Sequence, residues 1–318
     1  MALQLARHKN TVKLGGTHEI DLLKKMVIDR ENIQYLPGIK FPKSISVYPE
    51  LNNCLKDIRD ILIVVPSHGL RDTLTEILPF LNKNSRICWA TKGFELKSGK
   101  LPHQVAIEVL GKSRPVAVLS GPTFANEVAK GLPTAMTIAS NDSEFAGSLA
   151  SSISDENFRA YTSNDLIGLE VGGAVKNVLA IGAGICDGLN FGANARIALV
   201  TRGLVELTRL GAALGAKNET IMGLAGMGDL VLTCTDNLSR NRRMGLAIAN
   251  GISIDAAQKE IKQVVEGILA AKAVNEVAEK LGIEMPICYQ VFRILYENAS
   301  PREAVEKLMN RELKPENI

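Results

Sequence analysis

The sequence of 318 residues has four histidines, His8, His18, His68 and His103, and none follows residue 103. A proton-transfer site in the second half of the chain therefore needs a base other than histidine. The five cysteines are an odd number, lie far apart and include no Cys-x-x-Cys pair. This pattern excludes a disulfide framework and the common zinc motifs. It predicts buried, reduced cysteines in a cytoplasmic protein with no bound metal.

The chain also lacks a strong charge bias. Its formal net charge is +3 with 22% charged residues, which is too small an excess to favour nucleic acid as a partner. No uninterrupted apolar run approaches the roughly 18 residues that a membrane span needs, and the N-terminus has no basic region followed by an apolar one. The length is sufficient for about two domains with cores of their own.

Short apolar runs alternate with polar helical stretches in the first half of the chain. This alternation predicts a doubly wound (Rossmann-like) α/β domain. Helices are expected at 70–81 and 101–110, among others. The predicted strands are 11–14, 44–48, 61–65, 86–91, 115–120, 134–139 and 158–161.

Strand signals end near residue 165, and helical periodicity follows. The clearest predicted helices are 194–214, 266–281, 285–298 and 301–310. The chain is therefore predicted to contain a dinucleotide-binding α/β domain over 1–165 and an all-α substrate domain over 166–318.

The first half has no Gly-x-Gly-x-x-Gly loop, which links the first strand to the first helix in dinucleotide-binding domains. The near match, Gly182-Ala-Gly184-Ile-Cys-Asp-Gly188, lies in the second half, and close helix packing explains it better. The chain opens instead with a predicted helix at 1–7 and a strand at 11–14. We expect from this that strand one and its glycine loop are missing, and that the sheet is broken there.

Lys176 stands among small and apolar neighbours in the stretch 165–177. Burial disfavours the charged form of a lysine, so such a residue can act as an acid or base. The alternative is a lysine that extends from a helix surface to water. The residues alone leave both open.

Residues 223–243 combine a glycine-rich loop, Asp229 and the run Ser-Arg-Asn-Arg-Arg at 239–243. Free N–H groups at a helix start, together with arginine side chains, favour a phosphate site. A solvated basic face is the alternative. Lys92 and the Gly121–Thr123 loop follow predicted strands, where parallel sheets bind ligands, although Lys92 also suits a surface position before a turn.

Nine short runs together carry a family resemblance. They are YLP at 35–37, IVVPS at 63–67, WATKG at 89–93, SGPT at 120–123, GGAVKN at 172–177, FGANAR at 191–196, GMGDLVLTCT at 226–235, SRNRR at 239–243 and VVEG at 264–267. In this order, over nearly the whole chain, the sequence resembles the bacterial NAD(P)-dependent sn-glycerol-3-phosphate dehydrogenases.

The resemblance implies reversible reduction of dihydroxyacetone phosphate to sn-glycerol 3-phosphate for phospholipid synthesis, with NADP or NAD as cofactor and a homodimeric enzyme. It assigns Lys176 as the proton acceptor. The substrate-binding positions that it implies are Lys92, Gly121, Thr123, Lys176, Asp229, Ser239, Arg240 and Asn241. The cofactor-binding positions are Thr17, Tyr35, Lys92, Ala125, Arg240, Val264 and Glu266.

Two alternatives to this enzyme stay open from the sequence. Without strand one and its glycine loop, the chain could be a catalytically inactive, truncated relative that binds metabolite or subunit partners. The anion-binding run would also suit a related β-hydroxyacid dehydrogenase. The predicted strand at 11–14, which would be strand two of the fold, ends in the segment Leu14-Gly15-Gly16-Thr17-His18. This segment has no Asp or Glu to hold a ribose 2′-hydroxyl and no Arg to hold a 2′-phosphate, so the choice between NAD and NADP is undecided.

Overall fold

Seven short strands form in the first half of the chain, each from one of the predicted apolar runs. The computed structural model describes residues 1–8, 10–310 and 312, and all seven predicted strands are confirmed, with small shifts at their ends. They are β1 (Val12–Gly15), β2 (Ile45–Tyr48), β3 (Asp60–Ile63), β4 (Arg86–Trp89), β5 (Val116–Ser120), β6 (Thr134–Ser140) and β7 (Phe158–Ser163).

The strands divide into two sheets. β1 pairs with β2 in parallel, and the other five strands form a second sheet in the order β3-β4-β5-β6-β7. Pairing in the second sheet is parallel except between β5 and β6, which are antiparallel. A fully parallel sheet was expected from the alternation. The link between β5 and β6 carries only the short helix α6 (Ala125–Lys130), so the chain turns back at the same end of the sheet.

The expected break is present, because β1 and β3, the predicted neighbours of strand one, belong to separate sheets. The proposed absence of strand one is not supported. A strand, β1, follows the helix α1 (Ala2–Arg7) and is fully paired with β2. The predicted helix at 1–7 is confirmed. Two side chains of α1 attach it to later parts of the same half. Gln4 donates to the carbonyl of Ile153 at 2.9 Å, and Arg7 donates to the carbonyl of Val128 at 2.8 Å.

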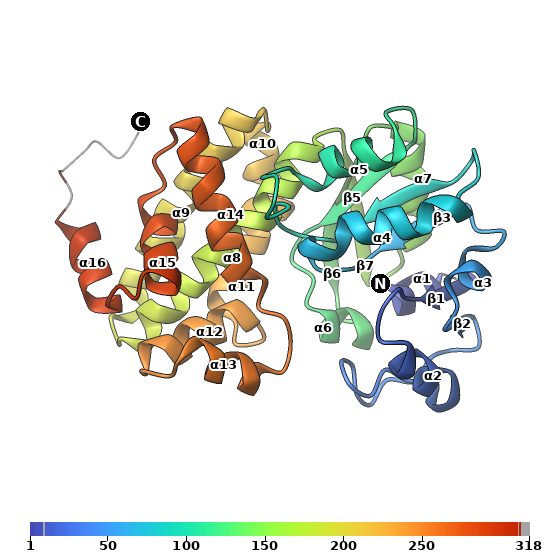
Figure 1. Ribbon diagram of the computed structural model, residues 1–318, viewed down its shortest axis with the longest axis horizontal. Helices are drawn as coiled ribbons and strands as arrows, with labels where there is room; N and C mark the ends of the chain where they lie inside the picture. The colour runs from blue at the N-terminus through green and yellow to red at the C-terminus, as the bar shows by residue number, and fades with distance from the viewer. Residues whose placement is uncertain (9, 311, 313–318) are drawn as a thin grey trace.

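Helices surround the five-stranded sheet, as Figure 1 shows. The predicted helix at 101–110 is α5 (Pro102–Leu110), and the one at 70–81 is α4 (Leu70–Ile77) followed by a 3₁₀ turn at Leu78–Phe80. Pro79 explains that change, because a proline lacks the N–H that would continue the α-helix. The remaining helices of this half are α2 (Ile20–Asp29), α3 (Leu51–Leu55) and α7 (Ser143–Ile153).

The second half is entirely helical within the described residues. Its elements are α8 (Leu166–Gly188), α9 (Gly192–Leu214), α10 (Asn218–Ile221), a π-helical turn (Leu224–Gly228), α11 (Asp229–Thr235), α12 (Arg240–Ala249), α13 (Ile254–Ile261), α14 (Glu266–Leu281), α15 (Pro286–Tyr296) and α16 (Pro301–Met309). The four predicted helices are confirmed. The last residues of the predicted domain, 311 and 313–318, lie outside the described residues.

Helix α8 is the centre of the helical half, and every residue from Gly168 to Cys186 is buried. By length and composition α8 could cross a membrane, yet 89% of its apolar window is buried inside the protein. Polar residues such as Glu170 and Lys176 interrupt its apolar stretches, so the helix contains no uninterrupted apolar run of that length. The other helices supply the apolar surroundings that explain this composition.

Helices α8 and α12 cross at glycines. A Cβ atom on Gly184 would overlap the carbonyl of Arg242, and one on Gly245 would overlap the carbonyl of Ile181. Only residues without a side chain allow the two backbones to approach so closely. The glycine pattern at 182–188 is therefore a packing feature, as predicted. All five cysteines are buried and free, also as predicted.

The cores of the two halves interpenetrate. Phe94 and Leu101, which follow β4 in the chain, are buried in the core of the helical half. Leu169 of α8 and Ala225 are in turn buried in the core of the sheet half. The carboxyl ends of β4 and β5 are thus held against the helices.

Candidate active site

Lys176 lies on the buried part of α8, and its side chain meets α11. Its Nζ donates to Asp229 Oδ1 at 2.5 Å and to Thr233 Oγ1 at 3.0 Å. Burial lowers the pKa of Lys176 to about 8, and the charge of Lys92 adds to this effect, while Asp229 opposes it. The alternative of a lysine extending to water is therefore wrong. At neutral pH this residue can give up and regain a proton.

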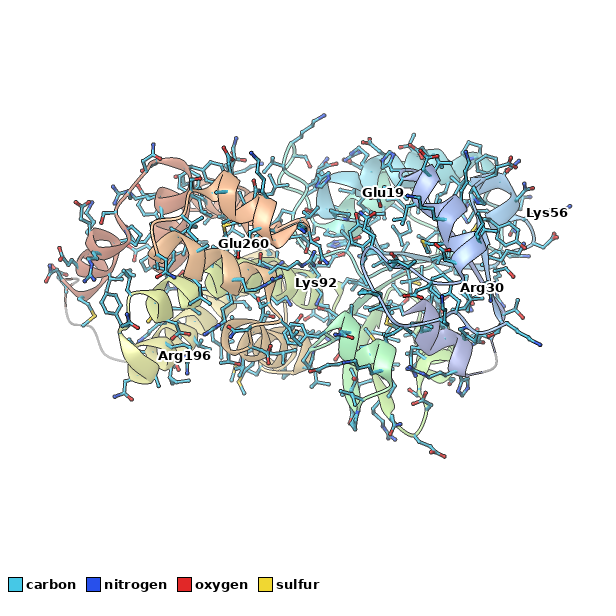
Figure 2. The ribbon with its side chains drawn as sticks, turned by 90° about the horizontal axis from the view of Figure 1, so that it is seen from below. Glu19, Arg30, Lys56, Lys92, Arg196 and Glu260 are labelled. Atoms are coloured by element: carbon cyan, nitrogen blue, oxygen red, sulfur yellow. The ribbon has the colours of Figure 1, made fainter. Side chains whose placement is uncertain are left out.

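Lys92 reaches the same carboxylate from the other half of the chain. It lies in the loop after β4, and its Nζ is 2.5 Å from Asp229 Oδ2 and 3.4 Å from the carbonyl of Gly121. Figure 2 shows Lys92 where the sheet half and the helical half meet. The alternative of a solvated surface lysine is wrong, because only 16% of its side chain is exposed.

Asp229 begins α11, directly after the π-helical turn that the glycine-rich stretch forms. Burial alone would raise the pKa of this carboxyl, but the ammonium groups of Lys176 and Lys92 lower it below its usual range. Asp229 is thus a buried carboxylate shared by two lysines. The short lysine contacts hold both ammonium groups on the same carboxylate.

Thr233 and Asn177 belong to this cluster and were missed in the sequence. Thr233 lies one helical turn after Asp229 and donates to that residue's carbonyl at 2.5 Å; its spacing on α11 is a signal that could have found it. Asn177 follows Lys176 on α8, and its Oδ1 accepts from Asn241 Nδ2 at 2.9 Å. Its own amide nitrogen is buried and has no partner among the described residues.

The run 239–243 forms the start of α12, as predicted for an anion site. Ser239 caps the helix by accepting from the backbone N–H of Arg242 at 3.2 Å. Asn241 bridges Asn177 and the backbone N–H of Gly267. One of the three arginines is not available there, since Arg242 forms an ion pair with Asp187. The free helix start and Arg240 supply the remaining positive potential.

The predicted cofactor positions fall into two groups. Arg240 donates to the carbonyl of Val264 at 2.9 Å, and Glu266 begins the next helix, α14. Burial raises the pKa of the Glu266 carboxyl, although the charges of Arg240 and Lys92 act in the opposite direction. Glu266 and Arg240 lie near the two lysines and belong to the helical half.

The other positions lie further from the lysines along the sheet half. Tyr35 is 40% exposed, and its hydroxyl donates to Glu19 at 2.7 Å. Thr17 follows β1, and Ala125 begins α6. Among the described residues, Thr17, Tyr35 and Ala125 make no hydrogen bond to the lysines or to Asp229. Figure 2 shows Glu19, the partner of Tyr35, on the sheet half, above and to the right of Lys92.

The loop after β5 lies against Lys92, whose Nζ donates to the carbonyl of Gly121. Gly121 has a φ of +147°, and a Cβ there would lie 2.9 Å from the Cα of Met136, so only glycine fits without strain. Thr123 donates from Oγ1 to the carbonyl of Gly121 at 3.2 Å. Over the described part of the chain, no cluster of three or more His, Cys, Asp or Glu residues could hold a metal ion.

Two family models match this chain. The model of the N-terminal part of NAD-dependent glycerol-3-phosphate dehydrogenase matches residues 1–146, and that of the C-terminal part matches residues 165–306. The first match begins at residue 1, which gives no support to a missing first strand.

Full-length relatives agree. The chain is 52% identical over 317 residues to the glycerol-3-phosphate dehydrogenase [NAD(P)+] of Psychromonas ingrahamii, a match that covers 99% of this chain and 95% of that protein. It is 52% identical over 318 residues to the enzyme of the same name from Aliivibrio fischeri, covering 100% and 92% of the two chains.

Solved structures are similar as well. The glycerol-3-phosphate dehydrogenase of Coxiella burnetii superposes with a TM-score of 0.95 at 46% identity, covering 98% of this chain and 94% of that one. D-mandelate dehydrogenase in complex with NADH, at 14% identity and a TM-score of 0.59, shares the fold alone. The sheet half, the helical half and the lysine cluster between them define a two-domain oxidoreductase. The chain belongs to the NAD(P)-dependent glycerol-3-phosphate dehydrogenase family.

Proposed function

We propose that this chain interconverts dihydroxyacetone phosphate and sn-glycerol 3-phosphate with Lys176 as the acid and base. The observation that carries this proposal is the buried lysine with a pKa lowered to about 8, held by Asp229 and Thr233. In the reducing direction its ammonium group donates a proton to the substrate's carbonyl oxygen. In the oxidising direction the neutral amine takes the hydroxyl proton back.

The substrate's carbonyl lies near both lysines in this proposal. Lys92, which is cationic, polarises the carbonyl oxygen as the bond is reduced. Asp229 fixes the two ammonium groups in one geometry, and Thr233 fixes the direction of Lys176. Gly121 and Thr123 border the substrate on the sheet side, next to Lys92.

The phosphate group binds at the start of α12. Ser239, Arg240 and Asn241 surround the free backbone N–H groups of that helix, where an anion is stabilised. The buried amide of Asn177 supports this placement. It lies next to Asn241 and lacks a hydrogen-bond acceptor among the described residues, and a phosphate oxygen would supply one.

NADH or NADPH supplies the hydride when bound. The residues present fit such a cofactor between the two halves, since Arg240, Val264 and Glu266 come together there near Lys92. Arg240 attracts its phosphates, and the half-exposed Val264 offers an apolar contact. Lys92 contacts cofactor and substrate alike. Thr17, Tyr35 and Ala125 extend this site along the sheet half.

The remaining parts of the proposal concern the whole protein. We place the boundary between the dinucleotide-binding and substrate domains at residues 165 and 166, and we expect a cytoplasmic homodimer that serves phospholipid synthesis. Sedimentation of the purified chain tests the dimer. The preference between NAD and NADP follows from the KM values for the two cofactors.

The decisive experiment compares Lys176→Met with the unaltered chain. Oxidation of NADH and of NADPH is followed with and without dihydroxyacetone phosphate. We expect loss of turnover by about 10²–10⁴-fold, the usual contribution of a general acid–base group. Lys272→Met, which changes a lysine 46% exposed on α14, is the control and should leave turnover unchanged. Turnover that survives in Lys176→Met would refute the role of this lysine.

A further inference from the structure

A second buried carboxylate, Glu170, lies on α8 outside the proposed substrate site. Its side chain is completely buried. Its Oε1 accepts from the indole Nε1 of Trp89 at 3.1 Å and from the backbone N–H of His103 at 2.9 Å. Its Oε2 lies 2.6 Å from His103 Nδ1. Burying a carboxylate is costly unless hydrogen bonds compensate it, and here both oxygens have partners.

These partners lie on the other half of the molecule. Trp89 ends β4, and His103 is in the first turn of α5. A carboxylate at the start of a helix is stabilised by the free N–H groups and the helix dipole. Glu170 therefore ties the central helix of the helical half to two elements of the sheet half through three contacts.

The loop that carries Lys92 lies directly beside these contacts. Lys92 is three residues after Trp89 and two before Phe94. The stem of Lys92 rests on Gly173 of α8, where a Cβ would lie 3.2 Å from Lys92 Cγ. Phe94, on the other side of Lys92, is buried in the helical core. Helix α8 thus contacts this loop before Lys92 and beneath it, and the core of the helical half holds Phe94 after it. The same helix carries Lys176.

We propose that Glu170 is a positioning residue for the reaction, which couples the Lys92 loop to helix α8 so that Lys92 and Lys176 meet on Asp229. This proposal rests on the proposed function of the two lysines. Glu170 does not touch the substrate. It acts through Trp89 and α5, whose places it fixes relative to α8.

A matched control is available in Glu206 on α9. This carboxylate is as deeply buried as Glu170, with 3% and 2% exposure of the two residues. Glu206 accepts from the backbone N–H groups of Ile287 at 2.6 Å and Cys288 at 3.1 Å, at the start of α15. It therefore stabilises the helical half alone. Substitution of Glu206 should cost stability without moving either lysine.

The test compares Glu170→Ala, Glu170→Gln and Glu206→Ala in the full chain. We expect kcat for glycerol phosphate oxidation to fall at least tenfold in Glu170→Ala and to change less than threefold in Glu206→Ala at a temperature where both are folded. Glu170→Gln keeps the acceptor for Trp89 and His103 and should restore most of the activity. Its similar size also makes it the variant more certain to fold.

The pH profile adds a readout that a loss of stability does not move. Lys92 helps to lower the pKa of Lys176, and Asp229 raises it. If Lys92 is displaced, its lowering effect is lost and Asp229 pairs with Lys176 alone, so the pKa of Lys176 should rise. The alkaline rise of the oxidation rate should therefore shift to higher pH in Glu170→Ala and stay in place in Glu206→Ala. Trp89 is the single tryptophan of the sequence, so its fluorescence should change in Glu170→Ala and not in Glu206→Ala.

Each outcome bears on one of the two proposals. If the unaltered chain turns over and Glu170→Ala behaves like Glu206→Ala in kcat and pH profile, the positioning role is refuted while the function of Lys176 stands. Unchanged Trp89 emission in Glu170→Ala refutes the contact on which the role depends. Absence of turnover in the unaltered chain refutes the proposed function and the positioning role with it.

Discussion

The proton equilibrium of Lys176 sets a pH dependence that can be measured. Burial lowers its pKa to about 8, and reduction needs the ammonium form, whereas oxidation needs the amine. We therefore expect the reduction of dihydroxyacetone phosphate to decline as pH rises through about 8. Oxidation of glycerol 3-phosphate should increase over the same range. Profiles of kcat/KM in both directions provide the measurement.

Asp229→Asn should move both pH profiles, the decline of reduction and the increase of oxidation, to lower pH. Asp229 is the charge that raises the pKa of Lys176 against burial and Lys92, so its removal leaves only the two lowering effects. Turnover should also decrease, because the two lysines lose their shared partner. Asp21→Asn changes a carboxylate that is 95% exposed and should leave the profile unchanged. A pH profile that moves to higher pH in Asp229→Asn would contradict this account.

Single residues differ in how well the sequence predicts them. A lysine among small and apolar residues made a buried Lys176 one of two interpretations that the sequence left open, and the motif resemblance pointed to Asp229. Their contact joins residues 53 positions apart, which periodicity does not predict. Glu170 was missed because its partners come from β4 and α5, and nothing in its own stretch indicates them. Arg242 was wrongly grouped with the anion site because Asp187, its partner, lies on another helix.

At the scale of elements, the crossing of α8 and α12 places the start of α12, the proposed phosphate site, in the same half as Lys176. Gly184→Ala and Gly245→Ala should each destabilise the protein by about 1–3 kcal/mol or more, because the added methyl overlaps backbone of the other helix. The displaced α12 should also raise the KM for the phosphate substrate. Urea denaturation and steady-state kinetics give the two quantities.

Gly147→Ala is the matched control for these variants. Gly147 lies in the helix α7, and a Cβ there would meet nothing within 4 Å. Alanine favours a helix over glycine, so this change should leave activity intact and stabilise the protein by up to about 1 kcal/mol. Equal loss of stability in all three variants would contradict the packing explanation.

Strands and long helices were predictable because each carries its own periodicity, such as the run of apolar residues before Pro66. The direction of β6 was not predicted. It depends on the end of the sheet at which the link through α6 returns the chain, and the local sequence carries no signal for this. The division into two sheets was expected, because the chain opens with a helix and a strand and without a glycine loop. The cause proposed for it, a missing strand one, is not supported. Short helices such as α3 and α10 have too few residues for a periodic signal.

At the scale of the whole molecule, the interpenetrating cores predict a single unfolding transition. Phe94 is buried in the helical core, and Leu169 is buried in the core of the sheet half, so neither half can lose its packing alone. Scanning calorimetry of the unaltered chain should therefore show one peak. Two well-separated peaks would refute this coupling.

Phe94→Ala tests the same coupling by mutation. Removal of the buried ring should cost about 3–5 kcal/mol of stability. Because Lys92 is two residues away, turnover should decrease as well. Phe80→Ala, which changes a phenylalanine 45% exposed, should do neither.

Helix α8 also has a consequence for the synthesis of the chain. Within the described residues it alone has the length and composition of a membrane span, and it is hidden by helices that follow it in the sequence. On the ribosome α8 emerges before α9, α11, α12 and α14, so a long apolar surface stays uncovered while they are made. The segment that holds the proposed acid and base is therefore also the one that chaperones and targeting factors meet as a nascent apolar stretch.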